Sequence, residues 1–171
     1  MVASGSSNKP SQTANLTKAI RLAASAGTGS PPWPRPTDTI TRAQQAGLFV
    51  GSSEGTAVHF HAHLDLLING QSQPVPAGLG LTSTKDSELH THDASGVIHI
   101  EAPGQGQWFL GQVFDEWNVR LTSTDIGGLA ANAKDNLRAY VGSLYLPCDC
   151  GEVRAVFVPP VTTLVAGRRD V

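Results

Sequence analysis

The sequence predicts a mainly β protein, a small single-domain barrel or sandwich of the jelly-roll or cupin-like kind with one or two short helices. Residues 58–68 alternate between apolar and polar side chains, with the two-residue period of a strand that has one buried face. Gly and Pro, at 18 and 11 of 171 residues, interrupt the chain often enough to favour short strands and turns over long helices. The length suits one domain with trailing segments.

The chain is expected to divide into three parts. Residues 1–36 are rich in Ser, Gly, Ala and Pro, which predicts a flexible segment with a weakly helical run at 16–24. Consecutive prolines around Trp33 require an extended backbone, and we expect the Trp33 ring to anchor this segment to the domain. A β-rich domain is expected at 37–166 and a frayed end at 167–171.

Local signals place the first elements of this domain. Residues 38–47 predict a short helix, because Asp38 suits a helix start and Gly47 suits a helix end. The long strand at 58–68 ends at Asn69-Gly70, a strong signal for a two-residue hairpin turn, with a return strand expected at 73–76.

A second hairpin is predicted between residues 89–92 and 97–102, because the intervening Asp, Ser and Gly suit a tight turn. Beyond it, apolar residues on one side of 109–117 predict a short amphipathic helix. The later expected strands are 137–146, 153–158 and 161–165.

All six histidines lie in three short runs between residues 59 and 99. In the first run, His59, His61 and His63 share with Asp65 the strand face opposite the apolar one. Imidazole is the commonest transition-metal ligand in proteins, and two rings at positions i and i+2 of a strand lie on one face. The first run therefore predicts a metal-chelating face.

The second hairpin is expected to add imidazoles to this face. With a four-residue turn, His90 faces His99 and His92 faces Val97. Directly opposed residues hold their Cβ atoms about 4.5–5.5 Å apart, which allows two rings to share one ion. The domain at 37–166 is thus predicted to bind metal through His61, His63, His90, His92 and His99, with His59 at the periphery.

Three carboxylates, Asp65, Asp93 and Glu101, each lie within two residues of a histidine. Each is expected to orient an imidazole, to ligate the ion or to act as a general base. We assign the catalytic roles to Glu101 and Asp65.

Imidazole ligands that leave a coordination position open predict a mononuclear metalloenzyme, foremost an oxidoreductase that uses copper or iron. Copper is favoured, with zinc, iron and manganese as alternatives. The absence of sulfur near the histidines argues against a closed thiolate zinc site. Three other interpretations stay open: a zinc-activated water in a hydrolase or hydratase, non-enzymatic metal storage, delivery or sensing, and a solvated, pH-responsive histidine face without metal. The pattern does not specify the substrate, small or polymeric.

The composition disfavours several classes of partner. Lys and Arg number 12 against 14 Asp and Glu, so no large field attracts nucleic acid or an anionic membrane surface. No apolar run approaches the roughly 18–20 residues that cross a bilayer, and no export signal is evident. Location is left open, and a homodimer is compatible with the sequence. Glycine spacing gives no phosphate-binding loop, and no serine is flanked as a hydrolase nucleophile.

The two thiols, Cys148 and Cys150, are separated by one residue. A disulfide across so short a span would be strained. We expect two incidental reduced cysteines, with a soft-metal or redox role as the alternative.

The histidine runs and their surroundings resemble a family of small, largely uncharacterised bacterial proteins. The resemblance covers about residues 31–142 and includes VHFHAHLD at 58–65, LHTHDASGVIHIE at 89–101 and LGQVFDEW at 110–117. It implies no function, but members are often preceded by an export or anchoring segment, which implies that related proteins are extracytoplasmic. From Gly142 onward the chain departs from the family's usual hairpin and final strand, which puts strands and ligands there in doubt.

Two alternate histidines on one strand and a third nearby are also similar to the patterns of cupins and α-type carbonic anhydrases. The likeness to cupins is partial. A cupin has a Glu a few residues after its first His pair and another His much later, whereas here Glu101 follows His99 and no histidine comes after it.

Overall fold

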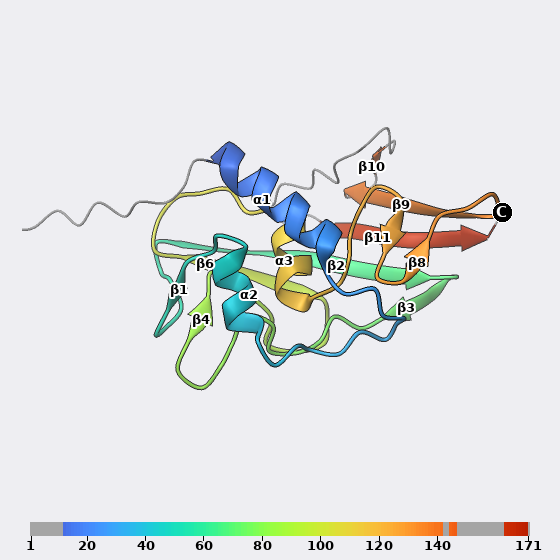
Figure 1. The fold of residues 1–171 in the computed structure, drawn as a ribbon. Coiled ribbons are helices and arrows are strands. Elements are labelled where there is room, and N and C mark those ends of the chain that lie inside the picture. The colour runs from blue at the N-terminus through green and yellow to red at the C-terminus, as the bar shows by residue number, and fades with distance from the viewer. Residues whose placement is uncertain (1–11, 142–143, 147–162, 171) are drawn as a thin grey trace, which may run out of the picture.

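A computed structural model describes residues 12–141, 144–146 and 163–170 of the chain (Figure 1). The described part is a mixed α/β fold in which three helices accompany a curled, half-barrel sheet. The helices are α1 (Gln12–Ser25), α2 (Thr39–Gln45) and α3 (Leu110–Trp117). The strands are β1 (Val50–Gly51), β2 (Val58–Ile68), β3 (Gln71–Gln73), β4 (Asp86–Ser87), β5 (Leu89–His90), β6 (Val97–Ala102), β7 (Asp125–Ile126), β8 (Leu129–Ala130), β9 (Asp135–Val141), β10 (Leu144–Leu146) and β11 (Thr163–Asp170).

The main sheet has seven strands in the order β10-β9-β11-β2-β6-β5, with β3 paired to β2 beside this path. Its pairs are antiparallel except β11 with β2, which run parallel. Within the described residues, β5 and β10 do not pair with each other, so the sheet is open. The expected β core is confirmed, but three helices make the fold mixed α/β and the sheet is not a closed barrel.

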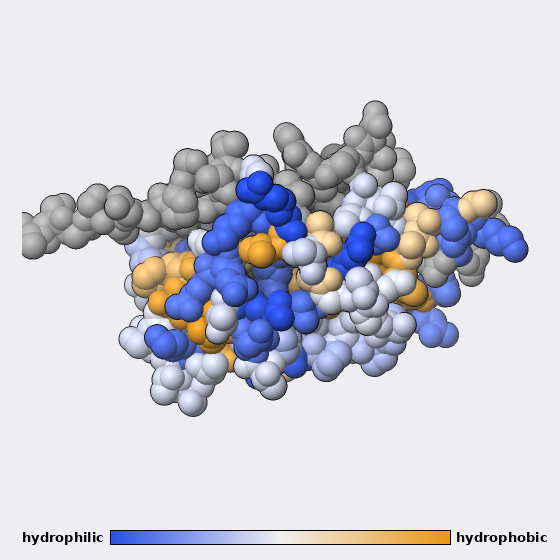
Figure 2. Space-filling view, in the orientation of Figure 1, coloured by the Kyte–Doolittle hydropathy of each residue, from blue (hydrophilic) through white to orange (hydrophobic). Residues whose placement is uncertain are grey.

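The helices lie together on one face of the sheet (Figure 1). On α3, the side chains of Leu110, Val113, Phe114 and Trp117 are each at most 1% exposed and join the core that β2 lines. Hydrophilic residues predominate on the side of the helices that faces the viewer in Figure 2. Because the helices bury the apolar face of β2, the opposite face remains for polar side chains.

The alternation predicted for β2 is confirmed from Ala62 to Ile68, whereas Phe60 on the same apolar face is only partly buried. Ala62, Leu64 and Leu66 are at most 2% exposed, while the residues between them are partly exposed. The Asn69-Gly70 turn has φ of 53° and 77°, the positive values of a type I′ hairpin. Such a turn pairs Gln71 directly with Ile68, so the return strand is 71–73 and not 73–76 as expected.

Part of the N-terminal segment is helical, over a longer stretch than the weakly helical run expected at 16–24. Residues 12–25 form α1, whose Ala19 and Ala23 are at most 2% exposed, and α1 packs on α3. Trp33 anchors the following segment as predicted: its ring meets the Trp117 ring edge-on at 5.9 Å, and Trp117 Nε1 donates to the Trp33 carbonyl at 3.1 Å. The expected domain boundary at residue 36 remains a prediction.

The short helix predicted at 38–47 is α2, and Gly47 follows its end with φ of 82°. The Asp38 side chain does not cap α2, because its carboxylate pairs with Arg42 at 2.9 Å. None of the described helices is long and apolar enough to cross a membrane.

The C-terminal strands differ in extent from the expected ones. The single strand expected at 137–146 is the antiparallel pair β9 and β10. Residues 167–170 were expected to be frayed, but they belong to β11: all four pair with β9, and Gly167 and Arg168 also pair with β2. The strand expected at 153–158 and the cysteines Cys148 and Cys150 lie outside the described residues.

Candidate metal centre

One imidazole from each of three adjacent strands lies in a single row across the sheet. On β6, His99 is paired with His61 of β2 on one side and with His90 of β5 on the other. The His99 ring centroid is 4.4 Å from that of His61 and 5.2 Å from that of His90. The predicted register of the second hairpin is therefore confirmed for His90 and His99. Since β5 ends at His90, His92 follows the strand and has no ladder partner assigned in the described sheet.

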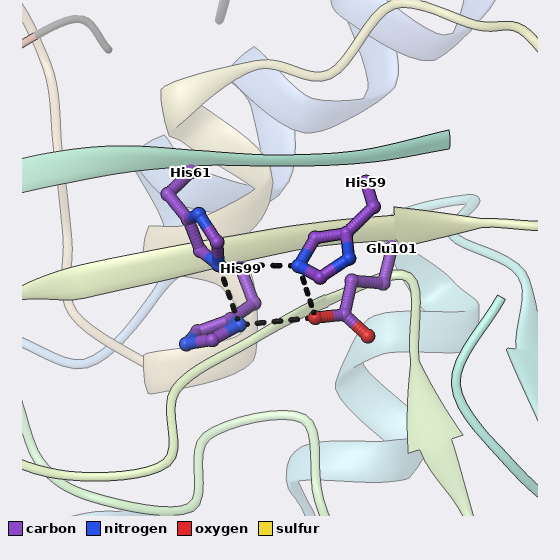
Figure 3. A group of neighbouring side chains, drawn as sticks. All are labelled: His59, His61, His99 and Glu101. Carbon is purple, nitrogen blue, oxygen red and sulfur yellow. Dashed lines mark hydrogen bonds and ion pairs between the residues drawn. The ribbon is translucent and has the colours of Figure 1, made fainter. Parts of the chain in front are cut away.

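The first group of converging side chains consists of His59, His61, His99 and Glu101, which we call quartet 1 (Figure 3). His61 Nε2 lies 3.3 Å from His59 Nε2 and 3.1 Å from His99 Nδ1. Glu101 Oε1 completes the ring, at 3.0 Å from His99 Nδ1 and 3.2 Å from His59 Nε2. His59 was expected at the periphery, but on β2 it faces Glu101 directly across the ladder.

The second group, quartet 2, consists of His90, His92, His99 and Glu101. One nitrogen or oxygen from each of these residues lies within 4.8 Å of the others. The His92 ring is edge-on to His99 at 4.4 Å and to His90 at 4.9 Å. Quartets 1 and 2 share His99 and Glu101, so the two groups form one continuous cluster.

His90 is held in the orientation of a prepared ligand. Its ring is buried, and its Nδ1 lies 2.9 Å from the Ser87 carbonyl oxygen. A carbonyl only accepts, so Nδ1 carries the proton and Nε2 presents a lone pair. Nε2 is buried and has no hydrogen-bond partner among the described residues. Such an orphaned buried acceptor is costly unless a further group satisfies it.

A second carboxylate, Glu54, reaches the cluster from the loop between β1 and β2. Glu54 Oε1 lies 3.3 Å from His92 Nε2 and 3.6 Å from His90 Nε2. The Glu54 carboxyl group is also hydrogen-bonded to that of Glu101. Glu54 could not be singled out from the sequence, although it lies only five residues before His59, because it precedes the alternating pattern of the strand.

Gly55 explains how this loop comes so close. A Cβ atom at Gly55 would lie 2.6 Å from both the Ala102 Cα and the Pro103 nitrogen. The loop therefore lies directly on the backbone at the end of β6, next to Glu101. Only glycine allows this approach, which places the Glu54 carboxylate at the cluster.

His63 and Asp65 lie outside both quartets. His63 Nε2 is 2.9 Å from the Ser95 carbonyl oxygen, and its Nδ1 is 3.3 Å from Asp65 Oδ2. Each ring nitrogen of His63 thus has a neighbour in the hairpin or on its own strand. Asp93 is also separate, since its Oδ1 accepts from the Ser95 amide at 2.8 Å. The catalytic role assigned to Asp65 remains a prediction without a contact to either quartet.

Two imidazoles of the row, His61 and His90, have lowered pKa values, which favours their neutral form. Burial lowers the pKa of His61, and the neighbouring His99 and His59 lower it further. Burial also lowers the pKa of His90, against the effect of its hydrogen bond to Ser87. A neutral imidazole is the form that binds a metal ion.

The two carboxyl groups are shifted in opposite directions. Burial and the negative charge of Glu101 raise the pKa of Glu54. Burial alone would raise the pKa of Glu101, but the hydrogen bond with His99 and the charges of His90 and His59 lower it. Glu101 is therefore the more readily ionised ligand.

A buried polar chain supports His90 from the helix side of the sheet. Glu116 of α3 is 1% exposed, and its Oε1 accepts from the Ser87 hydroxyl at 2.6 Å. The same Ser87 supplies the carbonyl that fixes the His90 tautomer. Such supporting contacts hold a ligand in place before an ion arrives.

Comparison with known proteins identified no relationship: no family model, curated protein or solved structure matches the chain.

Proposed function

We propose that this protein binds a transition-metal ion through the imidazoles and the carboxylate of quartets 1 and 2. The distances between the ligand atoms of quartet 1 support this proposal, because they match those around a tetrahedral metal ion. Ligands about 2.0–2.1 Å from a tetrahedral ion lie about 3.3 Å from one another. The four successive ligand separations in quartet 1 are 3.3, 3.1, 3.0 and 3.2 Å.

A solvated face of histidines without metal explains these distances less well. Exposed side chains are free to turn toward solvent, and hydrogen bonds between neutral rings would account only for the two imidazole–imidazole contacts of quartet 1. Instead, quartet 1 converges, and the buried His90 Nε2 has no hydrogen-bond partner among the described residues. A bound cation would explain both the convergence of quartet 1 and the lack of a hydrogen-bond partner at His90 Nε2.

The ion would be accessible from solvent. The His59 and His92 side chains are 58% and 47% exposed, while His99 is 19% exposed. An accessible ion with imidazole ligands has room for water or substrate, which distinguishes catalytic from structural sites. We favour a redox-active copper or iron ion and an oxidoreductase activity, as in the interpretation of the sequence, because imidazole ligands suit both metals.

A zinc-dependent hydrolase or hydratase is the second candidate, and Glu54 is the observation that favours it. Its carboxyl group is 43% exposed and contacts His92, a ligand of quartet 2. A carboxylate beside an ion can accept the proton of metal-bound water, whose pKa zinc lowers to about 7.

Metal analysis tests the proposal. Untagged protein, purified without nickel resin, should contain at least one equivalent of copper, iron or zinc by inductively coupled plasma mass spectrometry. The double variant His61→Ala/His99→Ala should contain less of this metal than the wild type, because it removes two ligands of quartet 1, of which His99 also belongs to quartet 2. His63→Ala is the matched control, since His63 lies on the same strand face outside both quartets.

The proposal is wrong if the wild type neither contains these metals nor takes them up on dialysis, or if the double variant retains the wild-type content. The metal found also separates the two activities. Copper or iron with peroxide-dependent oxidation of a small reductant supports the oxidoreductase, and zinc with hydrolysis of an activated ester supports the alternative.

A further inference from the structure

We infer that the cluster binds two cations at the same time, one in quartet 1 and one in quartet 2, with Glu101 as the shared ligand. This inference rests on the proposed metal binding and deepens it by assigning a dinuclear centre in place of a single ion. Three properties of the cluster lead to it: the number of ligands, their division into two groups, and their negative charge.

The ligands are too many for one ion. Five imidazoles and two carboxylates converge on this part of the sheet: His59, His61, His90, His92, His99, Glu54 and Glu101. Zinc sites take about four ligands, and an octahedral ion takes about six. A single four-coordinate ion would leave three of these seven groups without use, and an octahedral ion would leave one.

The ligands also divide spatially. His59 and His61 extend quartet 1 along β2, whereas His90 and His92 extend quartet 2 along β5 and the segment that follows it. Between them, on β6, lie His99 and Glu101, the members of both quartets. The central strand therefore supplies the two residues common to both quartets, and a separate pair of imidazoles lies on each side of it. Of these two residues only Glu101 can bind both ions, because a neutral imidazole such as that of His99 has one lone pair.

Glu101 has the chemistry of a bridging ligand. Its Oε1 is directed at quartet 1, at 3.0 Å from His99 Nδ1 and 3.2 Å from His59 Nε2 (Figure 3). A carboxylate has two oxygens, so the other remains for an ion in quartet 2. Two-metal sites of this kind hold their ions about 3.5–4 Å apart.

Glu54 gives quartet 2 its own negative charge. Two cations a few ångströms apart repel each other, so a dinuclear centre needs anionic ligands. The Glu54 carboxylate lies 3.3 Å from His92 Nε2 and 3.6 Å from His90 Nε2, the orphaned atom. Two adjacent carboxyl groups, Glu54 and Glu101, are themselves unfavourable as a pair of anions unless a proton or a cation lies between them.

Native mass spectrometry of the metal-free protein titrated with zinc tests the inference. The wild type is expected to bind two zinc ions per chain. His59→Ala should bind one, because quartet 1 loses a ligand, and the double variant Glu54→Gln/His92→Ala should bind one, because quartet 2 is impaired. His63→Ala should still bind two. Circular dichroism of each variant shows whether the fold is retained, and single substitutions Glu54→Gln and His92→Ala replace the double variant if it is not.

The possible results separate the two proposals. Wild type with one zinc ion overturns the dinuclear centre and leaves the proposed metal binding intact. Wild type with none overturns both. Two ions in folded variants of both quartets would mean that the ligands assigned here are not those that bind, which also overturns the inference.

Electron paramagnetic resonance of the copper(II)-loaded protein tests the sharing of Glu101. Two copper ions that share a carboxylate are spin-coupled, so the integrated signal at two equivalents should fall below two spins per chain. A full two spins per chain would show that the ions are independent and would overturn the shared ligand.

Discussion

Replacement of Asp115 by asparagine is expected to stabilise the protein as the pH rises. Asp115 on α3 is 4% exposed, and neither of its carboxyl oxygens has a hydrogen-bond partner among the described residues. Burial raises its pKa to about 8 from 3.8, against the opposing charges of Arg42 and Lys18. The folded protein therefore keeps a proton on Asp115 at pH values where the unfolded chain has released it.

The sign and size of the effect of Asp115 on the free energy of unfolding follow from proton linkage. Between about pH 4 and pH 8 the native state holds one more proton here than the unfolded state, so Asp115 lowers the free energy of unfolding as pH rises. The slope is about 1.4 kcal/mol per pH unit, and the full difference of about 4 units amounts to at most about 6 kcal/mol. Asp115 also lines a cavity of about 240 Å³ with Arg42 and Gln45, and entry of water there would reduce the effect.

Asparagine has the shape of the protonated acid and does not ionise. Chemical denaturation of wild type and Asp115→Asn at several pH values isolates the contribution of this one group. The free energy of unfolding of the variant should exceed that of the wild type only slightly near pH 4. This difference should grow through neutral pH and become constant above pH 8. Stability curves that run parallel from pH 4 to pH 9 would refute the reasoning.

Asp125→Asn is a control of opposite sign. Hydrogen bonds from Thr122 and Thr124 lower the pKa of Asp125, so its contribution is present at neutral pH and is lost as pH falls through the lowered value. Asp125→Asn should therefore be less stable than wild type at pH 7, and the difference should shrink in acid.

Three further substitutions test the packing and the cluster. Gly55→Ala should lower both the melting temperature and the zinc affinity, because its Cβ would meet the Ala102 backbone and displace Glu54. Gly104→Ala is the control and should change neither, because a Cβ at Gly104 would have no atom within 4 Å. Phe114→Ala should cost about 3–5 kcal/mol in denaturation, since Phe114 is 0% exposed in the core, and a loss below about 1 kcal/mol would contradict that burial. His90→Ala should weaken the rise in melting temperature that zinc produces in the wild type, because a ligand that binds only the native state stabilises it; an unchanged rise would exclude His90 as a ligand.

The sequence predicts β2 and α3 well because each carries its own periodic pattern. In β2 the apolar residues alternate along the whole strand, and in α3 they recur on one side, so local pattern and tertiary burial agree. The pairing of His90 with His99 was also predictable, since a short turn fixes the register of a hairpin.

Other features depend on contacts that no local pattern reveals. Glu54 reaches the cluster because Gly55 packs on the end of β6, a contact between segments almost 50 residues apart. α1 looked weak by composition, but packing on α3 stabilises it. The position of His59 in quartet 1 depends on the pairing of β2 with β6, which the hairpin signals did not specify.

X-ray absorption spectroscopy of the metal-loaded protein tests the central claim most directly. The account predicts a first shell of nitrogen and oxygen only, at about 2.0–2.1 Å, with the outer-shell scattering of several imidazoles. Sulfur at about 2.3 Å, which would point to cysteine ligands, or a shell of water oxygens without imidazole scattering would contradict it.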